Sequence, residues 1–302
     1  MWSPDDLDIR IIKTMASPHS FQWDVRISNA HVAKELDVDE ETVRNRLRHM
    51  EEAGFLQGWQ LILNPILLGM ESGIAEVRFN GQGSKDEVIS ELSLLEGVTL
   101  IDDFYGSELA VHLLYENEEM LNRQIHLIGY LTGHPNPAWW IEAFPTCKLD
   151  PTKTDWLIIQ ALRKRAREKL SDVAHDLQIS TRTVKRHMLR LIDGNAFYLD
   201  PLMDVSKIGG VRSRFWVVCE ESKKRAVDEK ALSTLKRIIS THTSPRKYSV
   251  FIVHCANASE VQEISHWLEK LDGVKEVRSN FDVEHIHIDK WLSREIEKRI
   301  AS

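Results

Sequence analysis

Two stretches of the chain carry clustered cationic and amide side chains of the kind that bind nucleic acids. Residues 42–46 (TVRNR) recur as residues 183–187 (TVKRH). An arginine can donate two hydrogen bonds to guanine, an asparagine can exchange two with adenine, and a lysine can neutralise a phosphate. The candidate DNA-binding residues are Arg44, Asn45, Arg48, His49, Thr181, Arg182, Lys185, Arg186 and Arg190.

The two stretches differ in the charges around them. Residues 40–52 contain the carboxylates of Glu40, Glu41, Glu51 and Glu52, which phosphates repel. The second stretch is preceded by a basic run suited to phosphates, namely Arg163, Lys164, Arg165, Arg167 and Lys169. Both stretches also fit the solvated helix face of a protein adaptor. We therefore predict that the protein binds double-stranded DNA, chiefly through its second stretch.

Other chemistry is less well supported by the residue pattern. Asp102 and Asp103 are neighbours in an expected strand, so their carboxylates diverge and make a poor acid–base pair. His285 and His287 share one strand face, without a cysteine or further histidine at ligand spacing, so we expect a surface pair. Nucleophile elbows and phosphate-binding glycine loops are absent from the sequence. We predict no catalytic residue, no metal and no cofactor.

Apolar spacing predicts the helices that present the basic residues. Val43, Leu47 and Met50 follow an i, i+4, i+7 pattern, and Val184, Met188 and Leu191 repeat it. Each stretch follows a shorter helix and a three-residue turn, at residues 37–39 and 178–180. This order indicates a helix-turn-helix. We expect residues 55–63 to form a β-hairpin wing.

After each expected wing the apolar period changes from helix to strand. The elements then follow the order β-α-β-β-α-β of a ferredoxin-like domain. In the second copy we expect a helix over residues 228–240, a short strand near Lys247, and an additional helix over 290–300.

Near-constant offsets indicate an internal duplication. The offset is 141 residues for the basic stretches, and the first copy holds about six extra residues near positions 17–23. We predict an α+β chain of two tandem repeats, each a winged helix-turn-helix followed by a ferredoxin-like domain. The expected domains are residues 1–66, 67–147, 148–205 and 206–302.

Composition limits the class of protein. The 302 residues are 42% hydrophobic and 28% charged, and the longest apolar runs fall short of the ~20 residues of a membrane span. The three cysteines, Cys147, Cys219 and Cys255, lie far apart and form no disulfide framework, and the N-terminus is acidic. We expect a cytoplasmic protein without membrane contact.

Charge is distributed unevenly. Residues 1–150 hold 11 basic and 25 acidic side chains, whereas residues 151–302 hold 28 and 21. This asymmetry indicates that the basic half meets a polyanion or that the halves attract each other.

Several motifs resemble those of the Lrp/AsnC family of transcriptional regulators. They are residues 7–12 (LDIRII), 26–36 (RISNAHVAKEL), 42–54 (TVRNRLRHMEEAG), 64–69 (NPILLG) and 106–109 (GSEL). The second copy matches over residues 181–191 and in the order of its elements. The resemblance implies DNA binding. Because family members pair through their α/β sheets, it also implies that the two α/β domains of this chain pack on each other as a pseudo-dimer, and that the chain forms a homo-oligomer.

The resemblance also implies that a small effector, such as an amino acid, binds near the turn before the third strand. The first copy has Gly106 and Ser107 in this turn, and Asp102 and Asp103 are near enough in sequence to bind an ammonium group. The second copy has Arg246 and Lys247 at the corresponding place. A plain hairpin turn at Gly106 explains the glycine equally well.

Two alternatives remain open. Siroheme decarboxylases share this architecture and occur as paired or fused copies, but the histidine-rich, arginine-flanked strand motif associated with them is absent here. A protein-interaction module with degenerate DNA-binding domains would carry the same helices without binding DNA.

Overall fold

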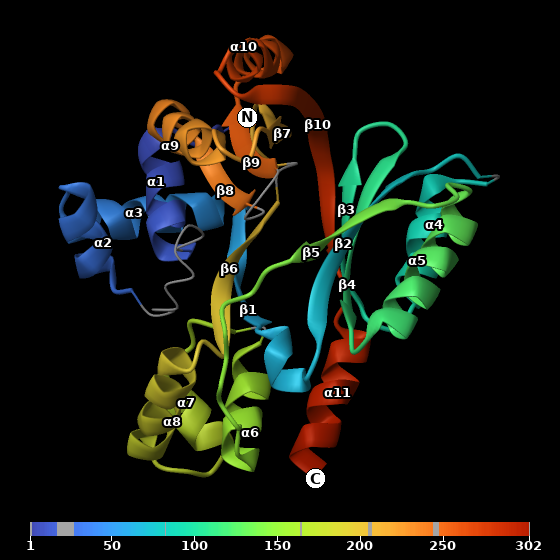
Figure 1. Ribbon diagram of the computed structural model, residues 1–302. Coiled ribbons are helices and arrows are strands. Elements are labelled where there is room, and N and C mark those ends of the chain that lie inside the picture. The colour runs from blue at the N-terminus through green and yellow to red at the C-terminus, as the bar shows by residue number, and fades with distance from the viewer. Residues whose placement is uncertain are drawn as a thin grey trace. The chain divides into compact units, whose positions relative to one another are not determined.

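The computed structural model describes residues 2–16, 27–81, 83–163, 165–204, 207–243 and 248–301, and it contains two compact units (Figure 1). The first unit comprises Met1–Trp59 and Asp200–Asp282, and the second comprises Gln60–Leu199 and Val283–Ser302. Each unit thus combines the helix-turn-helix of one copy with the sheet of the other. Three expected features lie outside the described residues, namely the extra residues near 17–23, the Arg246–Lys247 turn and the strand near Lys247.

The first unit begins with three helices and continues with the second sheet. Its elements are α1 (Asp6–Ala16), α2 (Asn29–Leu36), α3 (Glu40–Glu52), β7 (Val211–Cys219), α9 (Lys224–Thr234), β8 (Ile238–Thr243), β9 (Tyr248–Cys255) and α10 (Ala258–Glu269). Helices α9 and α10 cover one face of the sheet, where Phe215, Val217 and Phe251 are fully buried.

The second unit holds the first sheet, the second set of three helices and the C-terminal helix. Its elements are the 3₁₀ helix η1 (Pro65–Leu68), β2 (Glu71–Arg78), α4 (Lys85–Leu92), β3 (Val98–Phe104), β4 (Glu108–Tyr115), α5 (Glu118–Thr132), β5 (Ala138–Glu142), α6 (Lys153–Leu162), α7 (Leu170–Asp176), α8 (Thr181–Asp193) and α11 (Lys290–Ala301). Three strands have residues in both units, namely β1 (Leu56–Leu63), β6 (Phe197–Met203) and β10 (Val274–His287).

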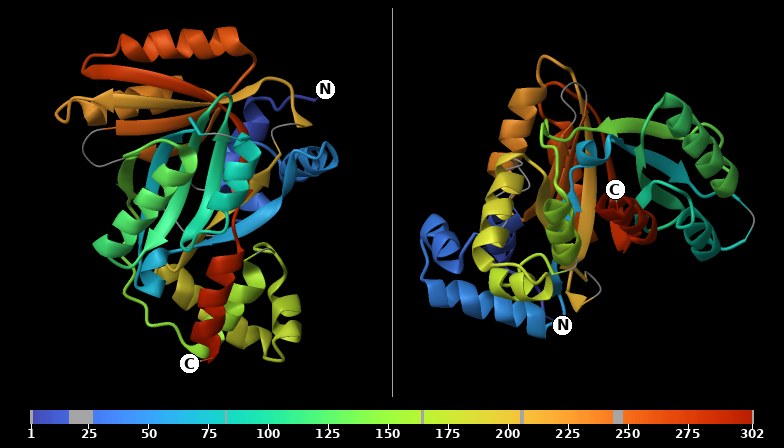
Figure 2. Two further views of the ribbon diagram at one scale, coloured as in Figure 1. Left: turned by 90° about the vertical axis from the view of Figure 1, so that its right-hand side faces the viewer. Right: turned by 90° about the horizontal axis from the view of Figure 1, so that it is seen from below.

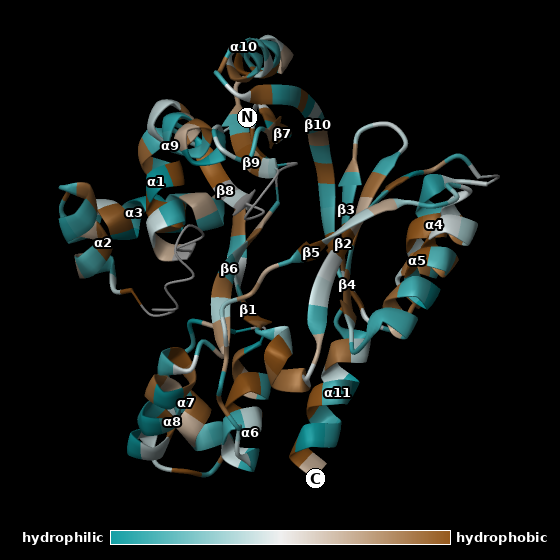
Figure 3. Cartoon of the chain, viewed as in Figure 1, coloured by the Kyte–Doolittle hydropathy of each residue, from teal (hydrophilic) through white to brown (hydrophobic). Residues whose placement is uncertain are grey.

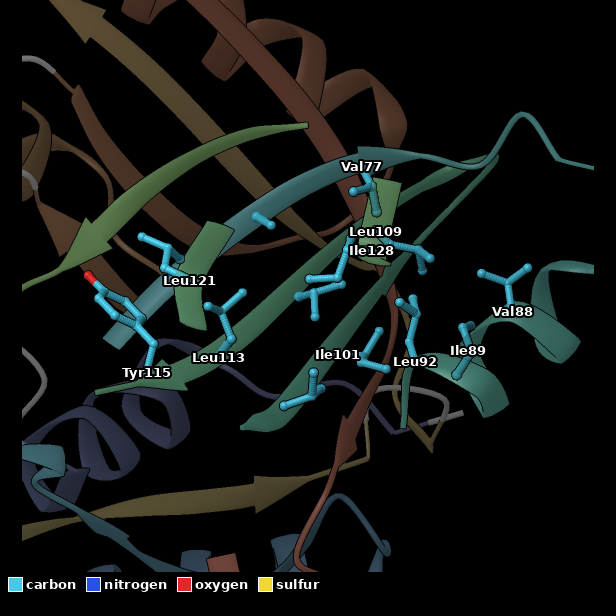
Figure 4. Packing of buried hydrophobic residues seen from close by; sticks show 13 residues of the cluster. Val77, Val88, Ile89, Leu92, Ile101, Leu109, Leu113, Tyr115, Leu121 and Ile128 are labelled. Carbon is cyan, nitrogen blue, oxygen red and sulfur yellow. The ribbon is translucent and has the colours of Figure 1, made fainter. Parts of the chain in front are cut away.

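The sheet of the second unit is antiparallel, and its strands have the order β5-β2-β4-β3. Helices α4 and α5 lie over one of its faces (Figure 2). Leu92, Ile101, Leu113 and Ile128 are fully buried between these helices and the sheet (Figure 4). Alternate strand residues face the opposite side, which brings Asp102 and His112 onto the same face.

The two copies correspond in their backbone as well as in sequence. Asp37 and Gln178 both adopt left-handed conformations, with φ of 56° and 54°, in the turns before α3 and α8. Asn117 and Asn257 both cap helices with their side chains. These pairs keep sequence offsets of 141 and 140 residues, so the duplication extends to local geometry.

Two predictions of secondary structure were wrong. Residues 55–63 form no hairpin, because β1 is one continuous strand that pairs with β6 and contains Gly58, which has φ of 143°. The helix expected over 228–240 ends at Thr234, and β8 begins at Ile238. The β-branched residues Ile238, Ile239 and Thr241 favour a strand there.

The helices are amphipathic, and in Figure 3 α10 and α11 show both hydrophobic and hydrophilic turns. Among the described residues, no helix is long and apolar enough to cross a membrane. Cys147, Cys219 and Cys255 are buried free thiols.

Candidate nucleic-acid interface

Local capping interactions position the second helix-turn-helix. Thr152 and Asp155 form a capping box at the start of α6. The Ser180 hydroxyl accepts a hydrogen bond from the Thr183 amide at 3.1 Å and thereby fixes the start of α8. Val184, Met188 and Leu191 are buried along α8, so the other face of this helix is presented to solvent.

The same principles position α3 in the first helix-turn-helix. Asp39 caps this helix by accepting a hydrogen bond from the Thr42 amide at 2.6 Å. Val43 and Met50 of α3 are buried on the inner side of the helix. The predicted DNA-binding residues Arg44, Asn45, Arg48 and His49 all lie on its exposed side.

The exposed cations of α3 are paired with acidic groups of their own helix. Arg44 lies 3.0 Å from Glu40, and Arg48 lies 3.9 Å from Glu52. Arg48 also donates a hydrogen bond to Asn45 at 2.7 Å. His49 stacks at a tilt on Trp2, with ring centroids 5.6 Å apart. The predicted residues of α3 therefore face solvent, but they already interact with neighbouring groups of the same chain.

The exposed cations of α8 have no such partners. Arg182, Lys185 and Arg186 are exposed and form no ion pair with any residue that the structure describes. Arg186 lies 3.5 Å from the His187 ring nitrogen. The first turn of α8 contains no acidic residue, whereas the first turn of α3 contains Glu40 and Glu41. Thr181, at the start of α8, is also exposed.

Arg190 differs from the other predicted residues of α8, because it is tied to α6. Its guanidinium pairs with the buried carboxylate of Asp155, which His187 also contacts at 2.7 Å. Burial raises the pKa of Asp155, but the hydrogen bonds from His187 and Thr152 and the charge of Arg190 outweigh it and lower the pKa. Arg190 thus holds the helices together.

The first copy contains an equivalent tie between its first and third helices. The buried Asp8 of α1 lies 3.3 Å from Arg46 of α3, and Asp5 lies 2.7 Å from the same arginine. Asp8 precedes Asp155 by 147 residues, and Arg46 precedes His187 by 141. A buried acid held by a base of the recognition helix is therefore common to both copies.

An open groove of about 1060 Å³ runs beside α8. It is lined by Thr146, Lys148, Leu149, Arg182, Lys185, Arg186, Leu189, Arg190, Asp193, Gly194 and Asn195. The depression beside α3 is about 440 Å³ and is lined by Trp2, Thr42, Asn45, Arg46 and His49. The larger and more cationic surface belongs to the second helix-turn-helix.

The basic run before α7 is only partly available for phosphates. Arg163 is buried and donates hydrogen bonds to Asp289 at 2.6 Å and to Ser293 at 3.0 Å, which docks α11 on α6. Arg165 pairs with Glu168 and Asp176. Lys164 lies outside the described residues. Arg163 was therefore misassigned, because a distant helix supplies its partners.

The predicted effector residues are separated by the sheet. Asp102 is buried and contacts the imidazoles of His112, at 3.0 Å, and His285. Glu142 lies 3.9 Å from the other nitrogen of His112. Burial lowers the pKa of His112, but the negative charge of Asp102, aided by Glu142, outweighs it and raises the pKa to about 9.

Asp103 and the turn after β3 are occupied by a lysine of the chain itself. Lys85 pairs with Asp103 and donates hydrogen bonds to the carbonyls of Phe104, at 2.6 Å, and Gly106, at 2.9 Å. Gly106 has φ of 88°, and the Ser107 carbonyl accepts a hydrogen bond from the Phe79 amide. The structure thus brings Asp103, Gly106 and Ser107 to one turn, but it places Asp102 elsewhere.

Sequence reasoning missed several residues of these sites. Lys148 is a basic residue in an acidic part of the sequence, and this contrast in charge could have marked it as a candidate. Leu189 lies outside the apolar stripe of α8 and is 53% exposed, which the helical period could have revealed. Lys85 gave no signal, because its partners come from another element. Among the described residues, no cluster of His, Cys, Asp and Glu is arranged to hold a metal ion.

Known proteins resemble both the sequence and the fold. Residues 4–57 match the family described as winged helix-turn-helix DNA-binding. An uncharacterized HTH-type transcriptional regulator of Pyrococcus abyssi is 32% identical over 131 residues, which cover 43% of this chain and 84% of that protein. The HTH-type transcriptional regulator FL11 of the same organism is 28% identical over 133 residues, covering 43% and 83%.

A solved structure resembles the whole chain in its fold. The crystal structure of the siroheme decarboxylase NirDL has a TM-score of 0.58 and 13% identity, and the match covers 98% of this chain and 99% of that chain. At this level of identity the likeness concerns the fold alone.

Proposed function

Because the chain belongs to the Lrp/AsnC family of HTH-type transcriptional regulators, we propose that it regulates transcription by binding double-stranded DNA chiefly through α8. In this arrangement α8 enters the major groove and presents side chains to base edges. Arg182, Lys185 and Arg186 make the polar contacts, with Thr181 near the backbone. Arg190 keeps its internal pairing with Asp155 and supports the helix.

The observation that carries this proposal is the different pairing of the two helices. Arg182, Lys185 and Arg186 have no acidic partner among the described residues, whereas Arg44 and Arg48 each lie beside a glutamate. Such exposed pairs contribute only about 0–1 kcal/mol each, so pairing alone does not silence α3. Glu40 and Glu41 also lie at the start of α3, the end of the helix that would approach the DNA. Their negative charges repel phosphates there.

Two triple variants test which helix binds. Replacing Arg182, Lys185 and Arg186 by alanine removes contacts that contribute roughly 1–3 kcal/mol each where they read a base. Replacing Arg44, Asn45 and Arg48 by alanine is the matched control. DNA recovered with the protein supplies the probe for fluorescence anisotropy. Undiminished affinity of the first variant, together with loss in the second, would overturn the proposal.

We also propose that the protein forms a homo-oligomer, as its resemblance to the family implies, and that it acts in the cytoplasm. Analytical ultracentrifugation of the full chain tests the assembly. A monomer at micromolar concentration would contradict it. Binding to no duplex at low salt, with a folded protein, would instead favour a protein-interaction module.

A second candidate function is a siroheme-decarboxylase-like activity on a tetrapyrrole. Two observations favour it, namely the fold likeness over the whole chain and a basic sheet face in the first unit. Arg212 and Arg214 of β7 and His254 of β9 share that face and are buried. Arg212 already lies 2.9 Å from Asp282, so its charge is partly balanced. Titration with haem, followed by absorbance, separates the candidates, because a regulator without this site leaves the spectrum unchanged.

A further inference from the structure

The groove beside α8 has a second wall that no helix supplies. Residues 144–150, which we call the connector, join β5 to the segment before α6 without regular secondary structure. The connector contributes Thr146, Lys148 and Leu149 to the lining of the groove, together with the cations of α8. The binding surface therefore includes chain that precedes the helix-turn-helix.

Hydrogen bonds hold the connector in place along its length. The Asn64 amide donates to the Pro145 carbonyl at 2.9 Å, and the Asn195 amide donates to the Thr146 carbonyl at 3.1 Å. At its far end Arg190 donates to the Asp150 carbonyl at 2.5 Å. A wall fixed at three points is already formed before a ligand arrives, so binding needs little ordering of this segment.

Leu149 and Gly194, which both line the groove, approach each other closely. A Cβ atom at position 194 would lie 3.1–3.2 Å from Leu149 side-chain atoms and 3.2 Å from the Arg190 carbonyl. Glycine thus lets the connector pack directly against the end of α8, and a side chain at this position requires Leu149 to shift.

The lining of the groove fits a sugar–phosphate strand. Lys148, Arg182, Lys185 and Arg186 are exposed cations, and among the described residues Asp193 is the one carboxylate that lines the groove. Lys148 forms no ion pair with any described residue. Leu189 and Leu149 add apolar surface to the same lining. Cations bind phosphates and apolar side chains can pack against deoxyribose, so this combination suits a nucleic-acid backbone.

We propose that the groove between the connector and α8 holds one strand of the DNA backbone, with Lys148 contacting a phosphate from the side opposite the recognition helix. This inference rests on the proposed function of α8. It assigns to a non-helical segment a contact that strengthens binding without reading sequence, because phosphates are the same at every base pair. An acidic peptide in the groove is the competing occupant.

Salt dependence of DNA binding tests the role of Lys148. Each phosphate contact adds about 0.9 to the slope of log affinity against log salt, so it accounts for roughly a 3.5-fold loss in affinity between 50 and 200 mM salt. We expect Lys148→Gln to lower the slope by about 1 with an unchanged preference among duplexes. Arg123→Gln, on the exposed side of α5, removes the same charge outside the groove and should leave the slope unchanged.

A second variant tests the groove without altering charge. Gly194→Val should displace Leu149 and the connector and should lower the salt slope as Lys148→Gln does. A wild-type slope in both variants, with DNA still bound, overturns the inference and leaves the proposed function intact. If the wild type binds no DNA, both the inference and the proposed function are wrong. Tight binding of a poly-glutamate peptide in place of DNA would identify an acidic peptide as the occupant of the groove.

Discussion

Helices α3 and α8 occupy the same place in two copies of one unit, yet their charges are satisfied in different ways. Both are capped, both bury an apolar stripe, and both follow a turn with a left-handed residue. Around α3 the cations meet glutamates of the same helix, whereas around α8 Arg182, Lys185 and Arg186 stay unpaired with described residues. A duplicated scaffold can therefore keep its geometry while one copy loses and the other keeps an electrostatic surface.

The largest expected effect concerns the buried acid that both copies use. The fully buried Asp155 is contacted by His187, Arg190 and Thr152, and removal of its charge leaves the half-buried guanidinium of Arg190 without its carboxylate. We expect Asp155→Asn to cost about 3–5 kcal/mol of stability in the second unit. Asp8→Asn should cost less, because Arg46 keeps its second acidic partner, Asp5, at 2.7 Å. Thermal unfolding of both variants measures the difference, and equal losses would contradict it.

The next two predictions concern two buried histidines on corresponding strands, His112 of β4 and His254 of β9. Acidic neighbours raise the pKa of His112 to about 9, so its contribution to stability is complete below pH 6.5 and is lost as pH rises toward 9. The loss is on the order of 3 kcal/mol. Unfolding midpoints between pH 6 and 10 should fall in the wild type and stay flatter in His112→Gln.

His254 should respond in the opposite direction. Burial and the nearby charge of Arg237 lower its pKa to about 4, so the folded state favours the neutral form of His254. Stability should therefore be complete above pH 6.5 and decline as pH falls toward 4. His254→Leu should flatten this acidic limb, and an unchanged limb would show that other groups cause it.

A smaller effect tests whether acidic groups suppress α3. Glu40→Gln combined with Glu41→Gln removes two negative charges and frees Arg44 from its pair. We expect DNA affinity to rise by roughly 1 kcal/mol, with a steeper salt slope. Glu118→Gln with Glu119→Gln, at the start of α5, changes net charge equally and serves as the control. Equal gains from both would indicate a long-range effect of net charge.

The last prediction concerns the turn of the first sheet. Gly106 has φ of 88° and open space around its Cβ position, so Gly106→Ala should cost only about 1–2 kcal/mol from backbone strain. Gly106→Arg should additionally abolish binding of an amino-acid effector, measured by calorimetry against the twenty amino acids. Identical heats for wild type and variant would show that this turn is only a hairpin.

Local sequence signals predicted the parts that local interactions determine. The caps Asp39 and Ser180 and the apolar stripe of α8 follow from neighbours within a few residues, so both recognition helices were predictable. Pairings across long sequence separations were not. The bond from Arg190 to Asp155, the pairing of β1 with β6, and the contact of Lys85 with Asp103 all join residues whose proximity depends on the fold.

The division of the sequence between the units has a consequence for synthesis on the ribosome. The first unit needs residues up to Asp282 and the second needs residues from Val283 onward. Neither can be completed until nearly the whole chain has emerged, whereas two simple tandem domains would fold one after the other. Long-range pairing of this kind also slows folding. A nascent chain paused near residue 150 should therefore expose an unpartnered helix-turn-helix and sheet, and should depend on chaperones at that stage.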